Sequence, residues 1–291
     1  MTGEPTILFC VGAAKAGTSW LHRVLSDHPA CALRSIKELH YFDALDRREV
    51  DRQITAVAAR RARYLSEMDG AGPHRLAVRA LQVADCDDWL GVLRRGEDRE
   101  AYLGYLGRGA EGRMVADMTP AYALLSEARL GRMASIGRDV RFLYLVRDPV
   151  ERLWSHVRMI ASERAAKDGN HAGRAAHVLS RVFRGKESEI EMRGDYRAAI
   201  GKLARAVDPR QLMVAVTEEM VTPAGLARIC AFLGIPTPEA DFSQRIHSGR
   251  AEPMQPEDRR TARQWLSAQY DFVAEWLGRR PAGWAYEPER V

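Results

Sequence analysis

Short apolar runs alternate with longer amphipathic stretches along this chain of 291 residues. A short continuous apolar run indicates a buried strand, and apolar residues spaced three and four apart indicate a helix. By this criterion strands are expected at 7–11, 113–116, 140–146 and 211–216. Helices are expected at 19–26, 126–136, 150–162, 196–207, 223–233 and 256–276. Strands that alternate with helices form βαβ units, so the pattern predicts an α/β fold with a central parallel sheet in three α/β/α layers.

Two charged stretches, 44–112 and 163–193, do not follow this alternation. Such insertions either cover a binding site or lie on the surface without a function. No linker, repeat or low-complexity tract divides the chain, so we predict a single domain, 1–291, with these stretches as helical insertions. Ligands of parallel sheets bind beyond the carboxyl ends of the strands, which directs attention to the residues after Val11, Ala116 and Val146.

The charge of the chain is mildly positive. Lysine and arginine total 44 and aspartate and glutamate 39, which gives a net charge of +5. The basic residues are dispersed, so a solvated basic surface or a compact anionic ligand explains the excess better than a nucleic-acid partner. Only five of the basic residues are lysines, and Lys15 and Lys37 fall in two of the motifs described below. An ammonium is a more compact donor than a guanidinium, which makes these two lysines candidates for a specific role.

The composition also predicts a cellular compartment. No apolar tract reaches about eighteen residues, so no membrane span is expected. The first ten residues lack the basic start of a signal peptide. The four cysteines are widely scattered without a CxxC pair, which predicts neither a disulfide framework nor a zinc site. We therefore expect a cytoplasmic protein.

The segment that joins the first strand to its helix has the features of a phosphate-binding loop. A helix N-terminus presents free backbone N–H groups and the positive end of the helix dipole, which suits a phosphate. Gly17 would let the backbone approach the ligand closely. Thr18 and Ser19 could cap the helix and donate hydroxyls to phosphate oxygens. The alternative interpretation is an ordinary capped turn between a strand and a helix.

This loop differs from the nucleotide triphosphatase loop GxxxxGK[ST] in the position of its charge. Gly12 and Gly17 have the right spacing, but Thr18 stands where that loop needs its lysine. The lysine lies inside the loop, at Lys15, where it would meet a 5′-phosphate and the group attached to it. The nearest candidate for a magnesium ligand is Asp117. The loop thus predicts a P-loop-like fold with altered chemistry.

A second anion site is predicted where the strand 140–146 ends. Arg147 follows this strand directly, Asp148 suits a helix N-cap, and Pro149 suits the first helical position. Ser155 lies eight residues after Arg147, near the second turn of the helix. An arginine at a strand end and a serine on the next helix can hold one phosphate from two sides. The alternative is that Arg147 only pairs with Asp148 or Glu151 and that Ser155 packs.

These elements, in this order, resemble the sulfotransferases that use 3′-phosphoadenosine 5′-phosphosulfate. The segment 15–21 resembles the 5′-phosphosulfate loop of that family, commonly PKSGTTWL, with Ala14, Ala16 and Ser19 as the replaced positions. LVRDPVERLWSH resembles the 3′-phosphate element, including the spacing of Arg147 and Ser155. The resemblance runs from residue 7 to about residue 250.

Two further motifs resemble those of the heparan sulfate sulfotransferases and related bacterial members. KELHYFD, at 37–43, resembles KEPHFFD, and DMTPAY, at 117–122, resembles EKTPxY. Met118 departs from this pattern, because that branch commonly has a lysine there that handles charge at the acceptor. The C-terminal cofactor loop has only a vague counterpart around Arg250. The adenine contact is uncertain, since the segment 217–220 replaces a motif that contains a tyrosine in the cytosolic branch.

The resemblance implies an in-line transfer in which positioning and charge stabilisation provide the catalysis. Lys15 would neutralise the leaving adenosine 3′,5′-bisphosphate, and the insertions 44–112 and 163–193 would cover the acceptor site. No metal is implied. The acceptor would be a hydroxyl, or an amine, of a carbohydrate or small metabolite. The residues implied in cofactor binding are Lys15, Ala16, Gly17, Thr18, Ser19, Trp20, Arg147, Ser155 and Arg250.

The resemblance implies that Glu38 accepts the acceptor proton, with His40 as the second candidate base. In an extended segment, residues two apart share a face, so both could reach the site. We expect Lys15 and Lys37 to keep Glu38 ionised and to disfavour a protonated His40.

Two other functions are compatible with the same loop. A P-loop nucleotide kinase would need a lysine at position 18 and magnesium. A nucleotide-binding module without turnover would bind adenosine 3′,5′-bisphosphate but lack a working Glu38.

Overall fold

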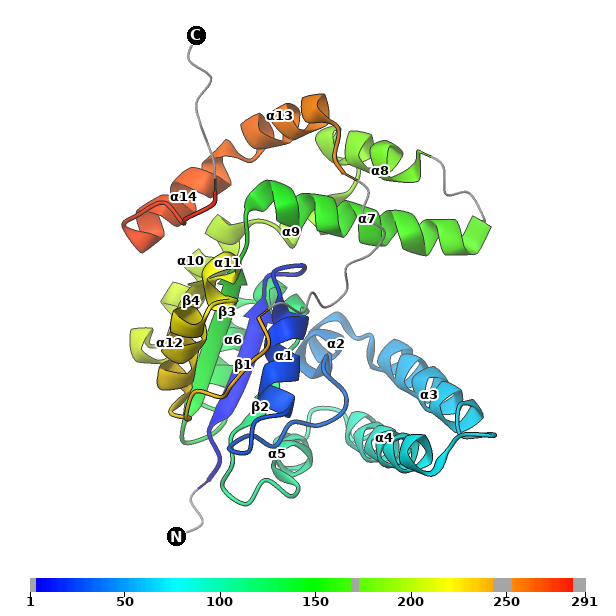
Figure 1. The fold of residues 1–291 in the computed structure, drawn as a ribbon. Coiled ribbons are helices and arrows are strands. Elements are labelled where there is room, and N and C mark those ends of the chain that lie inside the picture. The colour runs from blue at the N-terminus through cyan, green and yellow to red at the C-terminus, as the bar shows by residue number, and fades with distance from the viewer. Residues whose placement is uncertain (1–3, 169–172, 243–252, 285–291) are drawn as a thin grey trace.

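The computed structural model describes residues 4–168, 173–242 and 253–284, and its centre is a parallel sheet of four strands (Figure 1). The strands are β1 (Ile7–Gly12), β2 (Val115–Asp117), β3 (Val140–Val146) and β4 (Leu212–Val216), in the order β2-β1-β3-β4. Ile7 of β1 is in register with Val115 on one side and Val140 on the other. The four predicted strands are confirmed. β2 starts two residues later than expected, because Met114 instead forms an isolated bridge with Cys31.

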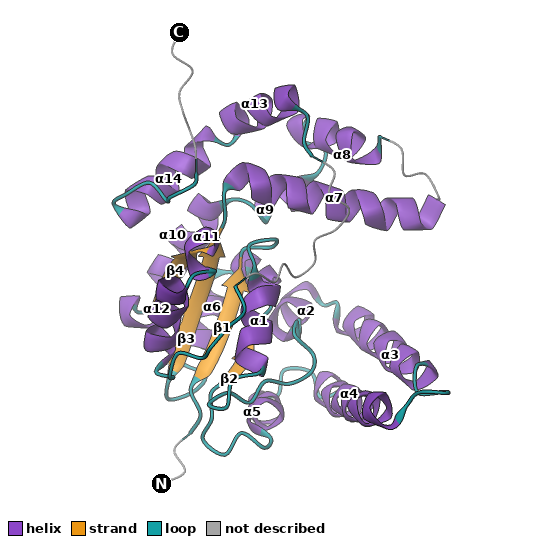
Figure 2. Ribbon diagram, viewed as in Figure 1, coloured by secondary structure: helices purple, strands orange, loops and turns teal. Residues whose placement is uncertain are grey.

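Helices cover both faces of this sheet (Figure 2). Those expected from the pattern are α1 (Thr18–Ser26), α6 (Glu127–Ala134), α7 (Pro149–Asp168), α10 (Tyr196–Ala206), α12 (Pro223–Leu233), α13 (Pro256–Trp265) and α14 (Ser267–Leu277). The short elements between them are the 3₁₀ helices η1 (Pro120–Leu124) and η2 (Pro209–Gln211) and the helix α11 (Thr217–Met220). The single helix expected at 256–276 is wrong, since it is divided at Leu266. β1 is buried along its whole length, which explains its continuous apolar sequence.

The two stretches that did not fit the alternation are largely helical. The first contains α2 (Tyr41–Arg47), α3 (Val50–Ser66), α4 (Pro73–Leu93) and α5 (Arg99–Gly107). The second contains the end of α7, α8 (Arg174–Phe183) and α9 (Ser188–Met192). The helices α3 and α4 pack against each other and project to one side of the sheet, whereas α7, α8, α13 and α14 lie beyond the carboxyl ends of the strands (Figure 1). That these segments cover the acceptor stays a prediction.

The four cysteines are buried and free, in line with their scattered spacing. Among the helices in the described ranges, none is long and apolar enough to cross a bilayer.

Candidate functional site

The loop between β1 and α1 has a backbone shape that few residues tolerate. Lys15 (φ 70°) and Gly17 (φ 83°) are both left-handed. A Cβ atom on Gly17 would also lie 2.9 Å from the methyl group of Thr217. The Thr217 hydroxyl donates to the carbonyl oxygens of Ala16 (2.7 Å) and Val146 (2.9 Å). Thr217, whose role the sequence did not reveal, therefore fixes the loop to the end of β3.

The start of α1 offers backbone donors to a ligand. Within the described part of the chain, no acceptor faces the N–H groups of Gly17, Thr18 and Ser19. Ala16 and Trp20 instead donate to carbonyl groups inside the loop, at 3.1 and 3.0 Å. Of the loop residues 16–20, which the resemblance implies in cofactor binding, three thus have an N–H group available. Free N–H groups at a helix N-terminus form an anion-binding site.

Positive charge accumulates beside this loop. The Nζ atom of Lys15 lies 3.6 Å from the Sδ atom of Met159 on α7. Burial, and then the charges of Lys37, Arg147 and Arg158, lower the pKa of the Lys15 ammonium. Cations that repel one another are stabilised by a bound anion. A ligand with several phosphate or sulfate groups therefore fits this site.

Arg147 points towards the loop rather than towards an acidic partner. Its guanidinium donates to the carbonyl oxygen of Lys15 at 3.3 Å. Glu151 is 3.9 Å away and pairs more closely with Arg259, at 2.7 Å. The backbone of Arg147 is held by the hydroxyl of Tyr196, which donates to its carbonyl oxygen at 2.7 Å. These contacts favour the ligand-binding interpretation over simple pairing with Glu151.

Two other residues are expected to bind the cofactor. Ser155 lies half-buried on α7, and its contact with a phosphate stays a prediction. Arg250 lies outside the described residues.

Contacts with the C-terminal part of the chain hold the turn that carries Arg147. The sequence did not reveal this support. Asp148 caps α7 as predicted, accepting from the N–H of Glu151 at 3.0 Å, and it also accepts from the hydroxyl of Tyr270 at 2.9 Å. The N–H of Asp148 donates to Glu218 at 3.1 Å. Glu218 in turn accepts from the indole of Trp284 at 3.0 Å.

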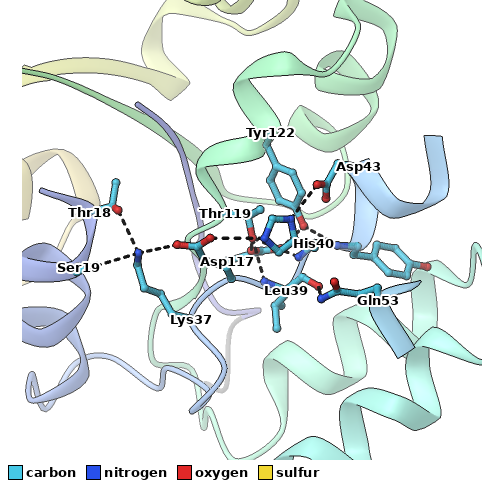
Figure 3. Close-up of polar contacts among 12 residues, drawn as sticks. Thr18, Ser19, Lys37, Leu39, His40, Asp43, Gln53, Asp117, Thr119 and Tyr122 are labelled. Carbon is cyan, nitrogen blue, oxygen red and sulfur yellow. Dashed lines mark hydrogen bonds and ion pairs between the residues drawn. The ribbon is translucent and has the colours of Figure 1, made fainter. Parts of the chain in front are cut away.

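A lysine joins the loop to the candidate base (Figure 3). The Nζ atom of Lys37 donates to the hydroxyls of Thr18 (3.1 Å) and Ser19 (3.2 Å) and to a carboxylate oxygen of Glu38 (2.9 Å). The other oxygen of Glu38 is 3.5 Å from the Nε2 atom of His40. Glu38 and His40 thus lie side by side in the structure.

The protonation of His40 differs from the expectation, whereas that of Glu38 does not. Burial opposes ionisation of Glu38, but hydrogen bonding to His40 and the charge of Lys37 outweigh it and lower the pKa of Glu38 to about 2. Burial also disfavours a charged His40. Hydrogen bonds to Asp43, at 2.8 Å from Nδ1, and to Glu38 nevertheless raise the pKa of His40 to about 9. The expectation that His40 avoids a proton is wrong, because Asp43 lies on its other side.

A buried carboxylate organises the segment that carries these residues. The Asp117 carboxylate accepts from the hydroxyls of Thr119 (2.6 Å), Tyr122 (2.7 Å) and Tyr102 (2.9 Å). Burial raises the pKa of Asp117 to about 6. Its oxygens are occupied and fully buried, so Asp117 is not available as a magnesium ligand. The nucleotide-kinase alternative needs a lysine at position 18 and a magnesium ligand. Position 18 is a threonine, and Asp117, the nearest candidate ligand, is not available.

The hydroxyls bound to Asp117 also accept hydrogen bonds from the backbone on both sides of His40. The Thr119 hydroxyl accepts from the N–H of Leu39 at 2.9 Å, and the Tyr122 hydroxyl accepts from the N–H of Tyr41 at 3.0 Å. The two contacts flank His40, whose φ of 52° is left-handed. The threonine and tyrosine of the motif at 117–122 therefore have a structural role, because they hold His40 in an unfavourable backbone conformation.

Met118 occupies the position at which the EKTPxY motif has its lysine. Its side chain is fully buried, and its N–H donates to the carbonyl oxygen of Lys37 at 3.3 Å. The ammonium beside Glu38 therefore comes from Lys37 and not from position 118.

The position of His40 between two carboxylates predicts a pH-dependent stability. A pKa raised to about 9 in the folded state stabilises the fold fully below the unfolded-state pKa of about 6.5. This stabilisation is lost as the pH rises through about 9. We expect His40→Gln to lower the melting temperature by several degrees near pH 6, and the difference from wild type to vanish near pH 10. Thermal unfolding across this range tests it, with the exposed His177→Gln as control. A difference that does not change with pH would contradict the prediction.

Comparison with known proteins agrees with this fold. No curated protein matches the chain significantly. The crystal structure of a sulfotransferase from Alicyclobacillus acidocaldarius is similar, with a TM-score of 0.61 and 21% identity over 95% of this chain and 97% of that chain. The sulfotransferase domain of the Synechococcus PCC 7002 olefin synthase is similar with a TM-score of 0.50 and 17% identity, over 92% and 96% of the two chains. The sulfotransferase family matches residues 5–239. Because this match covers most of the sequence, the chain belongs to the sulfotransferase family.

Proposed function

We propose that this sulfotransferase transfers a sulfuryl group to a hydroxyl, or an amine, of a carbohydrate or small metabolite. The observation that carries the proposal is the continuous chain of contacts from the loop hydroxyls of Thr18 and Ser19 through Lys37 to Glu38. It places a carboxylate beside the loop that suits a phosphosulfate. The donor, 3′-phosphoadenosine 5′-phosphosulfate, supplies the sulfuryl group when bound.

In this proposal Lys15 acts on the leaving group. Its ammonium lies inside the loop among other cations, where it neutralises negative charge that develops on the bridging oxygen. The N–H groups of Gly17, Thr18 and Ser19 bind the 5′-phosphate. Arg147, with Ser155 on the following helix, binds the 3′-phosphate.

Glu38 accepts the proton of the acceptor. Its low pKa keeps it ionised across the whole working pH range. A carboxylate with a pKa near 2 takes a proton only when the acceptor oxygen has become strongly acidic, as it does while it bonds to sulfur. We therefore infer that proton transfer accompanies or follows formation of the new bond. His40, already protonated between Glu38 and Asp43, positions the carboxylate.

The acceptor class rests on the motif at 37–43. Its Lys37, Glu38, His40 and Asp43 are joined by consecutive contacts, in support of a site like that of the heparan sulfate branch. Incubation with the donor and a panel of sugars, amino sugars and small alcohols tests the proposal. Mass spectrometry would detect the sulfated product, and chromatography would detect adenosine 3′,5′-bisphosphate. Release of the bisphosphate with no acceptor modified would contradict the acceptor class, and a failure to bind the bisphosphate would contradict the donor.

Arg147 is expected to discriminate in favour of a 3′-phosphate. A hydrogen bond to a charged group contributes about 1.5–3 kcal/mol, or roughly 10–150-fold in affinity. Arg147→Ala should weaken binding of adenosine 3′,5′-bisphosphate by this factor and leave binding of adenosine 5′-phosphosulfate nearly unchanged. Calorimetric titration of both ligands measures the difference, with the exposed Arg210→Ala as control. Equal weakening of both ligands would show that the 3′-phosphate binds elsewhere.

A further inference from the structure

A cavity of about 270 Å³ lies apart from the loop and the candidate base. Its walls come from the start of α2, the segment before α5 and the end of α6, and they include Tyr41, Phe42 and Ile136. Neither Lys15 nor Glu38 contributes to it. The volume equals that of about nine water molecules, enough for a ligand of one or two rings.

The aromatic wall of this cavity, formed by Tyr41 and Phe42, is preformed. Tyr41 stacks on Tyr102 with ring centroids 4.6 Å apart, and its hydroxyl donates to the carbonyl oxygen of Gly96 at 3.0 Å and accepts from the N–H of Asp98 at 2.8 Å. The Phe42 ring packs edge-on against Tyr102 at 5.0 Å. These contacts fix both rings, so a flat apolar ligand would bind without ordering them first.

The rim of the cavity carries unbalanced positive charge. Arg129 is buried and engages both nearby carboxylates, Asp46 and Glu97. Arg99 donates only to a neutral group, the carbonyl oxygen of Ile136, at 3.1 Å from Nε. Within the described residues the guanidinium of Arg132 has no hydrogen bond or salt bridge, although its charge helps to lower the pKa of Glu97, after the hydrogen bond and charge of Arg129. Neither Arg99 nor Arg132 therefore has a salt bridge in the described part of the chain, and the cavity-lining carboxylate Glu97 is paired with Arg129.

We propose that this cavity binds a small aromatic carboxylate. The aromatic wall would pack against an apolar ring. Arg132 and Arg99 would pair with a carboxylate, which a guanidinium binds through two parallel hydrogen bonds. A mostly apolar pocket with a few converging polar groups is the usual form of a small-molecule site. The wall residues Tyr41 and Phe42 directly follow His40, so the ligand would lie against the same segment that carries the candidate base.

Titration with 2-naphthoate, and with neutral 2-naphthamide as the matched ligand, tests this proposal. We expect naphthoate to bind at least about tenfold more tightly than the amide, because only the carboxylate pairs with Arg132. Arg132→Gln should remove most of this difference, whereas Arg138→Gln, at an exposed arginine outside the cavity, should not. In isoleucine-methyl spectra the Ile136 signal, identified with Ile136→Leu, should shift on binding. Ser135→Phe, at the rim, should block binding.

Three results would overturn the proposal. One is equal affinity for naphthoate and naphthamide. Another is binding that leaves the Ile136 signal in place. The third is displacement of naphthoate by saturating adenosine 3′,5′-bisphosphate, which would assign the anion to the phosphate loop. Each outcome is independent of whether the chain transfers a sulfuryl group.

Discussion

Lys15→Ala is expected to lower turnover by at least about a hundredfold while the fold stays intact. Loss of one donor that stabilises transition-state charge costs roughly 10²–10³ in rate, and Lys15 is the lysine inside the phosphate loop. The stability should not fall. Burial, and then repulsion from Lys37, Arg147 and Arg158, lowers the pKa of this ammonium, so its removal relieves unfavourable interactions in the free protein. Steady-state kinetics and thermal unfolding measure the two effects.

A matched lysine separates the specific effect of Lys15 from a general loss of charge. Lys186 is exposed, and Lys186→Ala should change neither turnover nor melting temperature. Turnover near wild type in Lys15→Ala would sink the assignment of this residue to the leaving group. A large fall in its melting temperature would instead assign Lys15 a structural role.

The sheet, and the edge of it where the candidate site lies, could be predicted because their causes are local in sequence. Strands buried on both faces are continuous apolar runs, and β1 and β3 stood out for this reason. The cap at Asp148 and Pro149 was readable because capping depends on adjacent residues. The carboxyl ends of β1 and β3 then placed Lys15 and Arg147 together without further information.

The features that were missed depend on contacts between distant segments. The division at Leu266 has no glycine or proline to announce it; it lets α13 pack against α7 and α14 against α10. The charged state of His40 was mispredicted because it requires two facts that a sequence does not contain. One is the left-handed turn at His40, and the other is the contact with Asp43 at the start of α2.

The Asp117 network illustrates the same limit. Thr119 and Tyr122 were recognisable only as part of a motif, and Asp117 suggested a metal ligand. In the structure Thr119 and Tyr122 hold the backbone on both sides of His40. The contact between Thr119 and Leu39 joins residues that are 80 positions apart in the chain. A sequence pattern identifies such residues but does not reveal which backbone they support.

Glu38→Gln is expected to lower the rate constant of transfer by at least about a hundredfold, the lower end of the effect of a general base. Glutamine keeps the size of the side chain, and its amide oxygen can still accept from Lys37 or from His40, but not from both, and it accepts no proton at this pH. The affinity for adenosine 3′,5′-bisphosphate should therefore stay nearly unchanged. Single-turnover kinetics and calorimetry measure the two quantities.

His40→Ala should cost less in rate and should change its dependence on pH. Hydrogen bonding to His40 is the largest of the effects that lower the pKa of Glu38, so its loss raises that pKa towards the ordinary value of about 4.3. The base must be ionised to act, and a higher pKa means that activity falls sooner on acidification. Between about pH 6 and pH 4 we expect the wild-type rate to stay level and the His40→Ala rate to decline. If His40→Ala is inactive at every pH while Glu38→Gln turns over normally, His40 is the base and Glu38 is a structural partner of Lys37.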